Sequence, residues 1–169
     1  GLRAFCEATA DMEDVRIVSR IKFRLGELHR EAVEEVVGQY NHLDLVARSD
    51  RSFEEDLVDC DVLVSYSSTT IHQALAFRRP VLLWGGSSRY RRIKGQSVPP
   101  TPEQRSAVYT CLSQKELKPM LSGILSVHAG SDLPDAEIVP YVHGIEGAEP
   151  APEVMELARD LSKQHFMRL

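Results

Sequence analysis

Four consecutive hydroxyl side chains are the most distinctive chemical feature of this sequence. They are Ser67, Ser68, Thr69 and Thr70, within "VLVSYSSTTIHQALAF". One hydroxyl is enough to cap the first turn of a helix, where free N–H groups and the helix dipole also attract anions. The run therefore predicts either a capped helix beside a solvated loop or a site that binds phosphate. The glycines and lysine of a phosphate-binding P-loop are absent.

Basic residues offer a second set of candidates. Lys22 and Arg24 end an apolar run, where they would neutralise phosphates or form a solvated strand end. A further basic cluster, 89–94, lies in a long loop, which favours a solvated surface over a ligand contact. The "DCD" motif at 59–61 enters a strand instead of leaving one, so no metal site is expected there.

These residues must be positioned by alternating strands and helices. Apolar runs predict strands over 15–23, 43–47, 61–65, 80–84 and 107–112. Helical periodicity predicts helices over 2–11, 27–40, 52–60, 69–78, 113–128 and 152–166. The fold class is thus α/β: a Rossmann-like doubly wound parallel sheet of about five strands, with helices on both faces. Such sheets bind ligands at the carboxyl ends of their strands.

Local signals refine the helices and the domain limits. Ser52 with Glu55, and Ser113 with Glu116, have the spacing of a capping box. Pro119 is expected to kink the helix after Ser113 or to restart it. Residues 1–150 form the predicted nucleotide-binding domain, and 151–169 a C-terminal amphipathic helix that packs on it or on an N-terminal domain of the same protein.

Composition and charge limit the class of protein and the compartment to which it belongs. The 169 residues carry a net charge of −5, which disfavours nonspecific binding to nucleic acid. No signal peptide or membrane span is expected. Three widely spaced cysteines predict no disulfide framework, and Cys60 and Cys111 are expected in the core of a protein from a reducing compartment.

The segment from Asp61 to Trp84, "DVLVSYSSTTIHQALAFRRPVLLW", resembles the donor-binding half of GT-B type glycosyltransferases, in particular bacterial enzymes of surface polysaccharide synthesis. The matching features are a strand, a Ser/Thr turn, a helix with Ala74 and Leu75, and the Pro80 corner before another strand. "FEEDLVDCDVLVS" and "IVSRIKFR" extend the resemblance. The family has a Gly-x-Pro corner, and Arg78 in place of that glycine suggests a different turn.

The resemblance implies a donor-binding domain that uses a nucleoside diphosphate sugar, with no other cofactor. The hydroxyl run Ser67 to Thr70 would hold the diphosphate, and Lys22 and Arg24 would neutralise it. Gln73 stands where the family's helix glutamate holds the ribose hydroxyls.

The implied partners are a nucleotide sugar, a glycan or lipid-linked acceptor and an N-terminal domain of the same protein. The implied location is the cytoplasm, at or away from the inner membrane surface. The catalytic base would come from the other domain, so no catalytic residue is named and this segment alone is expected to be inactive.

Three alternatives remain open. One is a sugar-nucleotide epimerase domain of the same architecture. Another is a non-catalytic Rossmann-like binding module; a receiver domain is disfavoured because Asp61 begins its strand. A dinucleotide oxidoreductase is disfavoured because no G-x-G-x-x-G follows a strand.

One expectation concerns the sheet itself. In the resembled fold a central strand precedes the helix predicted over 2–11. Without it, the strands around 15–23 and 61–65 would leave two open edges inside the sheet. The expectation is that an upstream strand or another chain fills this interval, and direct pairing of these two strands would argue for a different fold.

Overall fold

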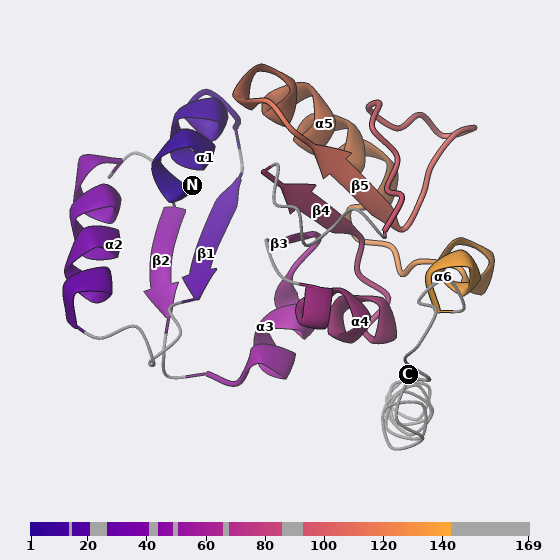
Figure 1. Cartoon of the computed structure of the whole chain (residues 1–169), viewed down its shortest axis with the longest axis horizontal. Helices are drawn as coiled ribbons and strands as arrows, with labels where there is room; N and C mark the ends of the chain where they lie inside the picture. The colour runs from indigo at the N-terminus through magenta and orange to yellow at the C-terminus, as the bar shows by residue number, and fades with distance from the viewer. Residues whose placement is uncertain are drawn as a thin grey trace.

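The computed structural model describes residues 1–13, 15–20, 27–40, 44–48, 51–65, 68–85 and 93–142 (Figure 1). The helices are α1 (Leu2–Thr9), α2 (Glu27–Gln39), α3 (Phe53–Asp59), α4 (Ser68–Ala76), α5 (Gln114–His128) and α6 (Asp135–Val142). The strands are β1 (Arg16–Arg20), β2 (Asp44–Arg48), β3 (Leu63–Ser65), β4 (Val81–Trp84) and β5 (Val108–Cys111). The predicted helix over 152–166 lies outside the described residues.

The fold is mixed α/β and is built on parallel strands. A three-stranded sheet has the order β3-β4-β5, and both of its pairings are parallel. β1 and β2 form a separate parallel pair. Within the described residues no pairing joins β1 to β3, so the strands do not make one continuous sheet.

The side chains of β4 alternate between two hydrophobic clusters. Leu82 and Trp84 belong to a cluster that includes residues of α1 and α5. Val81 and Leu83 belong to a second cluster that includes residues of α3 and α4. All four β4 residues are buried, which explains why the strand is a continuous apolar run instead of an alternating one. Trp84 is only 7% exposed and belongs to the core.

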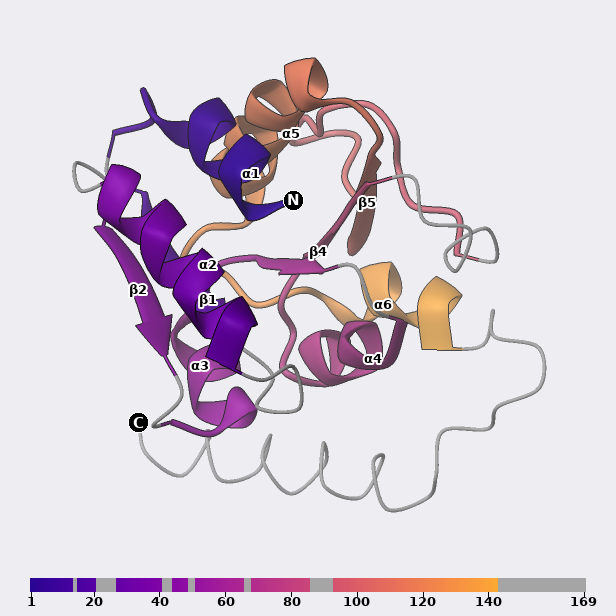
Figure 2. The ribbon, with the colours of Figure 1, turned by 60° about the vertical axis from the view of Figure 1, so that its left-hand side comes forward.

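Helix α1 packs along α5. Glu7 accepts a hydrogen bond from Gln114 (2.9 Å), and Asp11 accepts one from Lys118. Figure 2 shows the two helices next to each other on the same side of β4. This contact, between residues more than 100 positions apart, attaches the first helix to the three-stranded sheet.

The local signals at the helix starts gave mixed results. At α3 the capping box is confirmed, because Glu55 N–H donates to Ser52 Oγ (3.1 Å) and Ser52 N–H donates to the Glu55 carboxylate (2.7 Å). At α5 the predicted capping box is wrong, since the Ser113 side chain makes no capping hydrogen bond. Helix α5 also runs through Pro119 without restarting.

The corner between α4 and β4 is held by two arginines. Arg78 has a φ of 57°, the left-handed conformation that glycine adopts without strain. The sequence suggested a different turn here because arginine stands in place of glycine. Arg78 nevertheless adopts the backbone conformation that glycine favours. Its guanidinium donates to the Leu133 carbonyl (2.7 Å) and pairs with Asp135 (2.6 Å), while Arg79 pairs with Asp132 (3.0 Å).

Candidate functional site

The predicted phosphate-binding junction lies between β3 and α4. β3 ends at Ser65, and α4 begins at Ser68, so the junction is at the carboxyl end of a parallel strand. Ser65 Oγ and Thr70 Oγ1 lie 2.5 Å apart and form a hydrogen bond. Ser65 is only 6% exposed. This hydroxyl pair connects the end of the strand to the first turn of the helix.

The buried face of α4 determines where its polar residues lie. Ile71, Ala74 and Leu75 are buried in the core. Thr70 and Gln73 are half-buried and stand three positions apart, so they are neighbours on the helix surface. A hydroxyl and an amide on adjacent turns can together contact one polar ligand at this end of the sheet.

The other predicted ligand residues are only partly described. Ser67, Lys22 and Arg24 lie outside the described residues. Ser68 and Thr69 belong to the first turn of α4, but their side chains lie outside the described part. The structure thus brings Thr70 to Ser65, which sequence reasoning missed, while Gln73 lies one turn further along α4. The available signal for Ser65 was its position, a hydroxyl at the polar end of an apolar strand.

Arg20, the last residue of β1, already makes structural contacts. Arg20 Nη1 donates to Asp56 Oδ2 (2.6 Å) and to the Arg51 carbonyl (2.9 Å). The Arg20 guanidinium also lies 5.7 Å from the centre of the Phe53 ring. This arginine therefore ties β1 to α3 and has a structural role. Sequence reasoning missed it because its partners lie more than 30 positions away.

Two surface pockets lie away from the hydroxyl pair. One, of about 390 Å³, is lined by Cys60, Asp61, Arg79 and Asp132 among others, at the amino end of β3. The other, of about 670 Å³, lies between α1 and the first turns of α5. Their side chains are largely committed to ion pairs and hydrogen bonds already described, such as Arg79–Asp132 and Lys118–Asp11.

The described thiols are poorly suited to nucleophilic chemistry. Burial raises the pKa of Cys60 to about 11 and also raises the pKa values of Cys6 and Cys111. A thiol with a raised pKa holds little thiolate at neutral pH. Cys111 is buried, as expected, whereas Cys60 is only partly so. In the described ranges, no group of three or more metal-binding side chains comes together.

A buried polar network lies near the amino end of β5. Tyr109 Oη and His128 Nε2 are 2.8 Å apart, and the Ser106 N–H donates to the same hydroxyl (2.9 Å). Burial raises the pKa of Tyr109 to about 12 and lowers the pKa of His128. Both side chains are therefore neutral at pH 7, which suits hydrogen bonding between α5 and β5 within the core.

Comparisons with protein-family models, curated proteins and solved structures give no match. None of the helices in the described ranges combines the length and apolar content that crossing a bilayer requires.

Proposed function

We propose that this chain is the nucleotide-sugar-binding domain of a GT-B type glycosyltransferase of surface polysaccharide synthesis. Its five described strands would then belong to one doubly wound, Rossmann-like sheet that is completed where β1 and β3 are not paired. The observation that carries the proposal is the hydroxyl pair Ser65–Thr70, which joins the carboxyl end of a parallel strand to the start of a helix. Parallel α/β sheets bind nucleotides at such positions.

The proposed site holds the donor through its diphosphate and ribose. The first-turn N–H groups of α4 and the hydroxyl of Thr70 donate to phosphate oxygens. Gln73, one turn further along the same side of the helix, contacts the ribose hydroxyls. Lys22 and Arg24 add positive charge.

Glycosyl transfer requires stabilisation of the leaving diphosphate, which a helix dipole and cationic side chains supply. The acceptor is a glycan or a lipid-linked glycan. The catalytic base belongs to an N-terminal domain of the same protein. The reaction takes place in the cytoplasm, at or away from the inner membrane surface.

Calorimetry with UDP, CDP and GDP tests the proposal. One of the three should bind, and Thr70→Val should weaken that binding about tenfold or more, the scale of one lost hydrogen bond to a charged group. Ser126→Ala, at an exposed position of α5, is the matched control and should leave the affinity unchanged. If no diphosphate binds the folded chain at millimolar concentration, the proposal fails.

A second variant tests the role of Gln73. A carboxylate accepts two hydroxyl hydrogen bonds with the added strength of its charge, whereas an amide accepts one and donates one. Gln73→Glu should therefore tighten binding of the preferred diphosphate by about 1 kcal/mol. The nucleoside monophosphate with the same base should show the same gain, since it retains the ribose. Unchanged affinity would show that this side chain does not contact the sugar of the nucleotide.

A further inference from the structure

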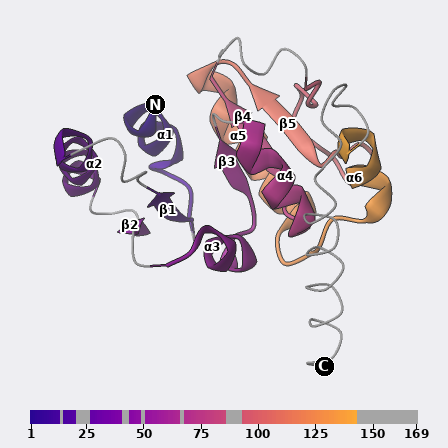
Figure 3. The same cartoon turned by 60° about the horizontal axis from the view of Figure 1, so that its bottom comes forward.

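The outer edge of β5 is uncharged and belongs to a segment that readily forms strands. β5 pairs with β4 on one side and lies at the end of the three-stranded sheet on the other (Figure 3). The surrounding stretch "SAVYTCLS", residues 106–113, contains no charged residue and no proline. Proteins protect edge strands from pairing with other chains by charged residues, by prolines or by a covering segment. Because β5 has neither charges nor prolines, its protection depends on a cover.

Residues 93–105 form such a cover, which we call the edge strap. The strap runs beside β5 on the side away from β4 (Figure 1). The Gln96 N–H donates to the Val108 carbonyl (2.9 Å), and the Thr110 N–H donates to the Gln96 carbonyl (2.9 Å). The Ala107 carbonyl, one position before Val108, accepts from β4 instead. Since backbone groups of consecutive strand residues point to opposite sides, the strap bonds to the outward groups of β5.

Two glycines allow the strap to approach its neighbours closely. A Cβ atom at Gly95 would lie 2.5 Å from Thr110 Oγ1 and 2.9 Å from the carbonyl carbon of Tyr109. A Cβ atom at Gly123 of α5 would lie 2.9 Å from Cδ of Pro100, a buried residue of the strap. Neither glycine has a positive φ. Both positions therefore require glycine for the close approach itself, against β5 in one case and against α5 in the other.

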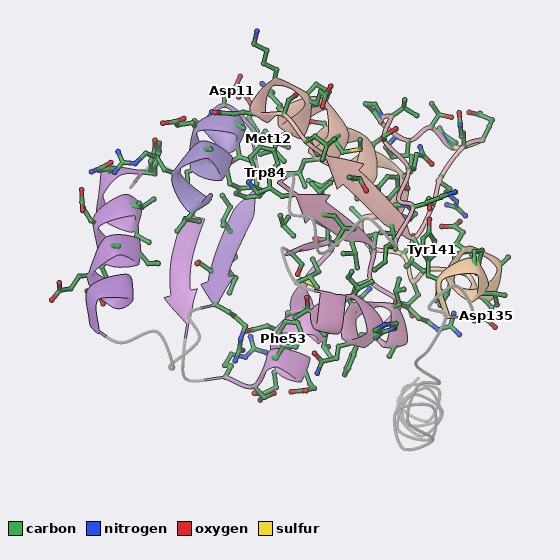
Figure 4. All side chains as sticks on the ribbon, viewed as in Figure 1. Asp11, Met12, Phe53, Trp84, Asp135 and Tyr141 are labelled. Carbon is green, nitrogen blue, oxygen red and sulfur yellow. The ribbon has the colours of Figure 1, made fainter. Side chains whose placement is uncertain are left out.

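Helix α6 holds the strap from a third side. The Tyr141 hydroxyl donates to the Lys94 carbonyl (3.4 Å), and Tyr141 Oη lies 2.6 Å from Ser106 Oγ. Figure 4 shows Tyr141 on the side of α6 that faces the sheet and the strap. Ile93, the first residue of the strap, packs against the same hydrophobic cluster as Tyr141. The strap is thus fixed on β5, α5 and α6.

The strap is poorly suited to pairing with a further strand. Thr101 and Gln104 donate their N–H groups to each other's carbonyls (3.1 Å each), so part of the strap is paired with itself. Pro99, Pro100 and Pro102 have no N–H group to donate. A strand that met this surface would find few partners for its own backbone, so the sheet ends at the strap.

We propose that the edge strap prevents the outer edge of β5 from pairing with β5 of a second copy of this chain. Among the described residues the strap pairs with β5 only at Gln96, whereas a whole strand would offer a longer ladder. Two copies of one edge, related by a two-fold axis, pair in antiparallel fashion and close the assembly. The uncharged β5 strands would not repel each other. The inference concerns the sheet and holds whichever ligand the hydroxyl junction binds.

The test compares Gly95→Ala with the matched control Gly38→Ala, because a Cβ atom at Gly38 of α2 meets no atom within 4 Å. Amide hydrogen exchange is measured at Thr110, which bonds to the strap. Val81 is the internal reference, because its N–H donates to the Ala107 carbonyl inside the sheet (2.9 Å). In dilute solution Gly95→Ala should speed exchange at Thr110 about tenfold or more, with a smaller effect at Val81. The control should change neither.

Self-association separates a protective cover from a loop with a merely structural role. Sedimentation over a range of protein concentrations should show Gly95→Ala forming dimers at a concentration about tenfold or more below that of the control. Protection of Thr110 in the Gly95→Ala variant should return as these dimers form, because a second β5 then replaces the strap.

Gly123→Ala releases the strap from α5 instead of from β5. Alanine favours the helix at this position, so the substitution opposes the packing of Pro100 without weakening α5 itself. It should also speed exchange at Thr110 and strengthen self-association.

Three results would overturn the proposal. The first is equal exchange at Thr110 in Gly95→Ala and in the control. The second is a Gly95→Ala variant whose Thr110 amide is exposed but which associates no more strongly than the control. The third is equal acceleration at Val81 and Thr110 in both strap variants, because the strap would then be part of the core and not a separate cover.

Discussion

Replacing Arg78 by alanine or by glycine separates backbone strain from side-chain contacts at the corner before β4. The guanidinium of Arg78 bonds to the Leu133 carbonyl and to Asp135. The side chain of Asp135 is 79% exposed, so that ion pair contributes less than about 1 kcal/mol. A bond from a charged donor to a carbonyl contributes about 1.5 kcal/mol. Arg78→Ala should therefore lower the free energy of unfolding by about 2 kcal/mol.

Arg78→Gly loses the same contacts but removes the strain of a left-handed residue. That conformation costs a residue with a Cβ atom about 1–2 kcal/mol, and the entropy that glycine adds to the unfolded chain offsets about 0.4–1 kcal/mol of this gain, which leaves about 1 kcal/mol. The glycine variant should therefore be about 1 kcal/mol less stable than the unaltered protein and about 1 kcal/mol more stable than the alanine variant. Urea unfolding at pH 7, followed by circular dichroism, measures all three free energies.

Arg79 provides the matched control, because its φ is not positive. There glycine only adds conformational entropy to the unfolded chain, so Arg79→Gly should be less stable than Arg79→Ala by about 0.4–1 kcal/mol. The order of the two variants must reverse between the neighbouring positions. If alanine is the more stable substitution at both, the left-handed conformation of Arg78 is wrong.

Two further predictions concern a helix cap and a buried histidine. Ser52→Ala should cost about 1 kcal/mol in urea unfolding because it removes the cap of α3, whereas Ser113→Ala should cost little, and equal losses would contradict the difference between the two caps. Burial lowers the pKa of His128 in the folded protein, so the unfolded chain protonates this histidine at a higher pH than the folded chain does. The contribution of the neutral His128 to the free energy of unfolding should be fully present above about pH 6.5. It should fall below that pH by at most about 1.4 kcal/mol per pH unit. His128→Gln should flatten that acid-side slope in unfolding curves measured between pH 4 and 8, and an unaltered slope would exclude this residue as its source.

Much of the local structure follows from neighbouring residues alone. The capping box of Ser52 and Glu55 works because both partners lie within one helical turn. The apolar runs of β1, β3, β4 and β5 predict strands because their residues favour an extended, buried backbone. Helix α6 was missed, because its eight residues include Pro140 and lie among glycines and prolines without a clear period.

The tertiary structure decided what depends on residues far apart in the chain. The helix spacing already places Thr70 and Gln73 on one side of α4, and Ser65 is only five positions from Thr70, but burial of the apolar face of α4 against the sheet decides how this side lies relative to the end of β3. Arg20 became a structural contact because folding brings it to Asp56, and no local pattern reports such a distance. The separation of β1 from β3 is likewise a property of strand pairing, since a strand's own residues specify its extended shape but not which edge finds a partner.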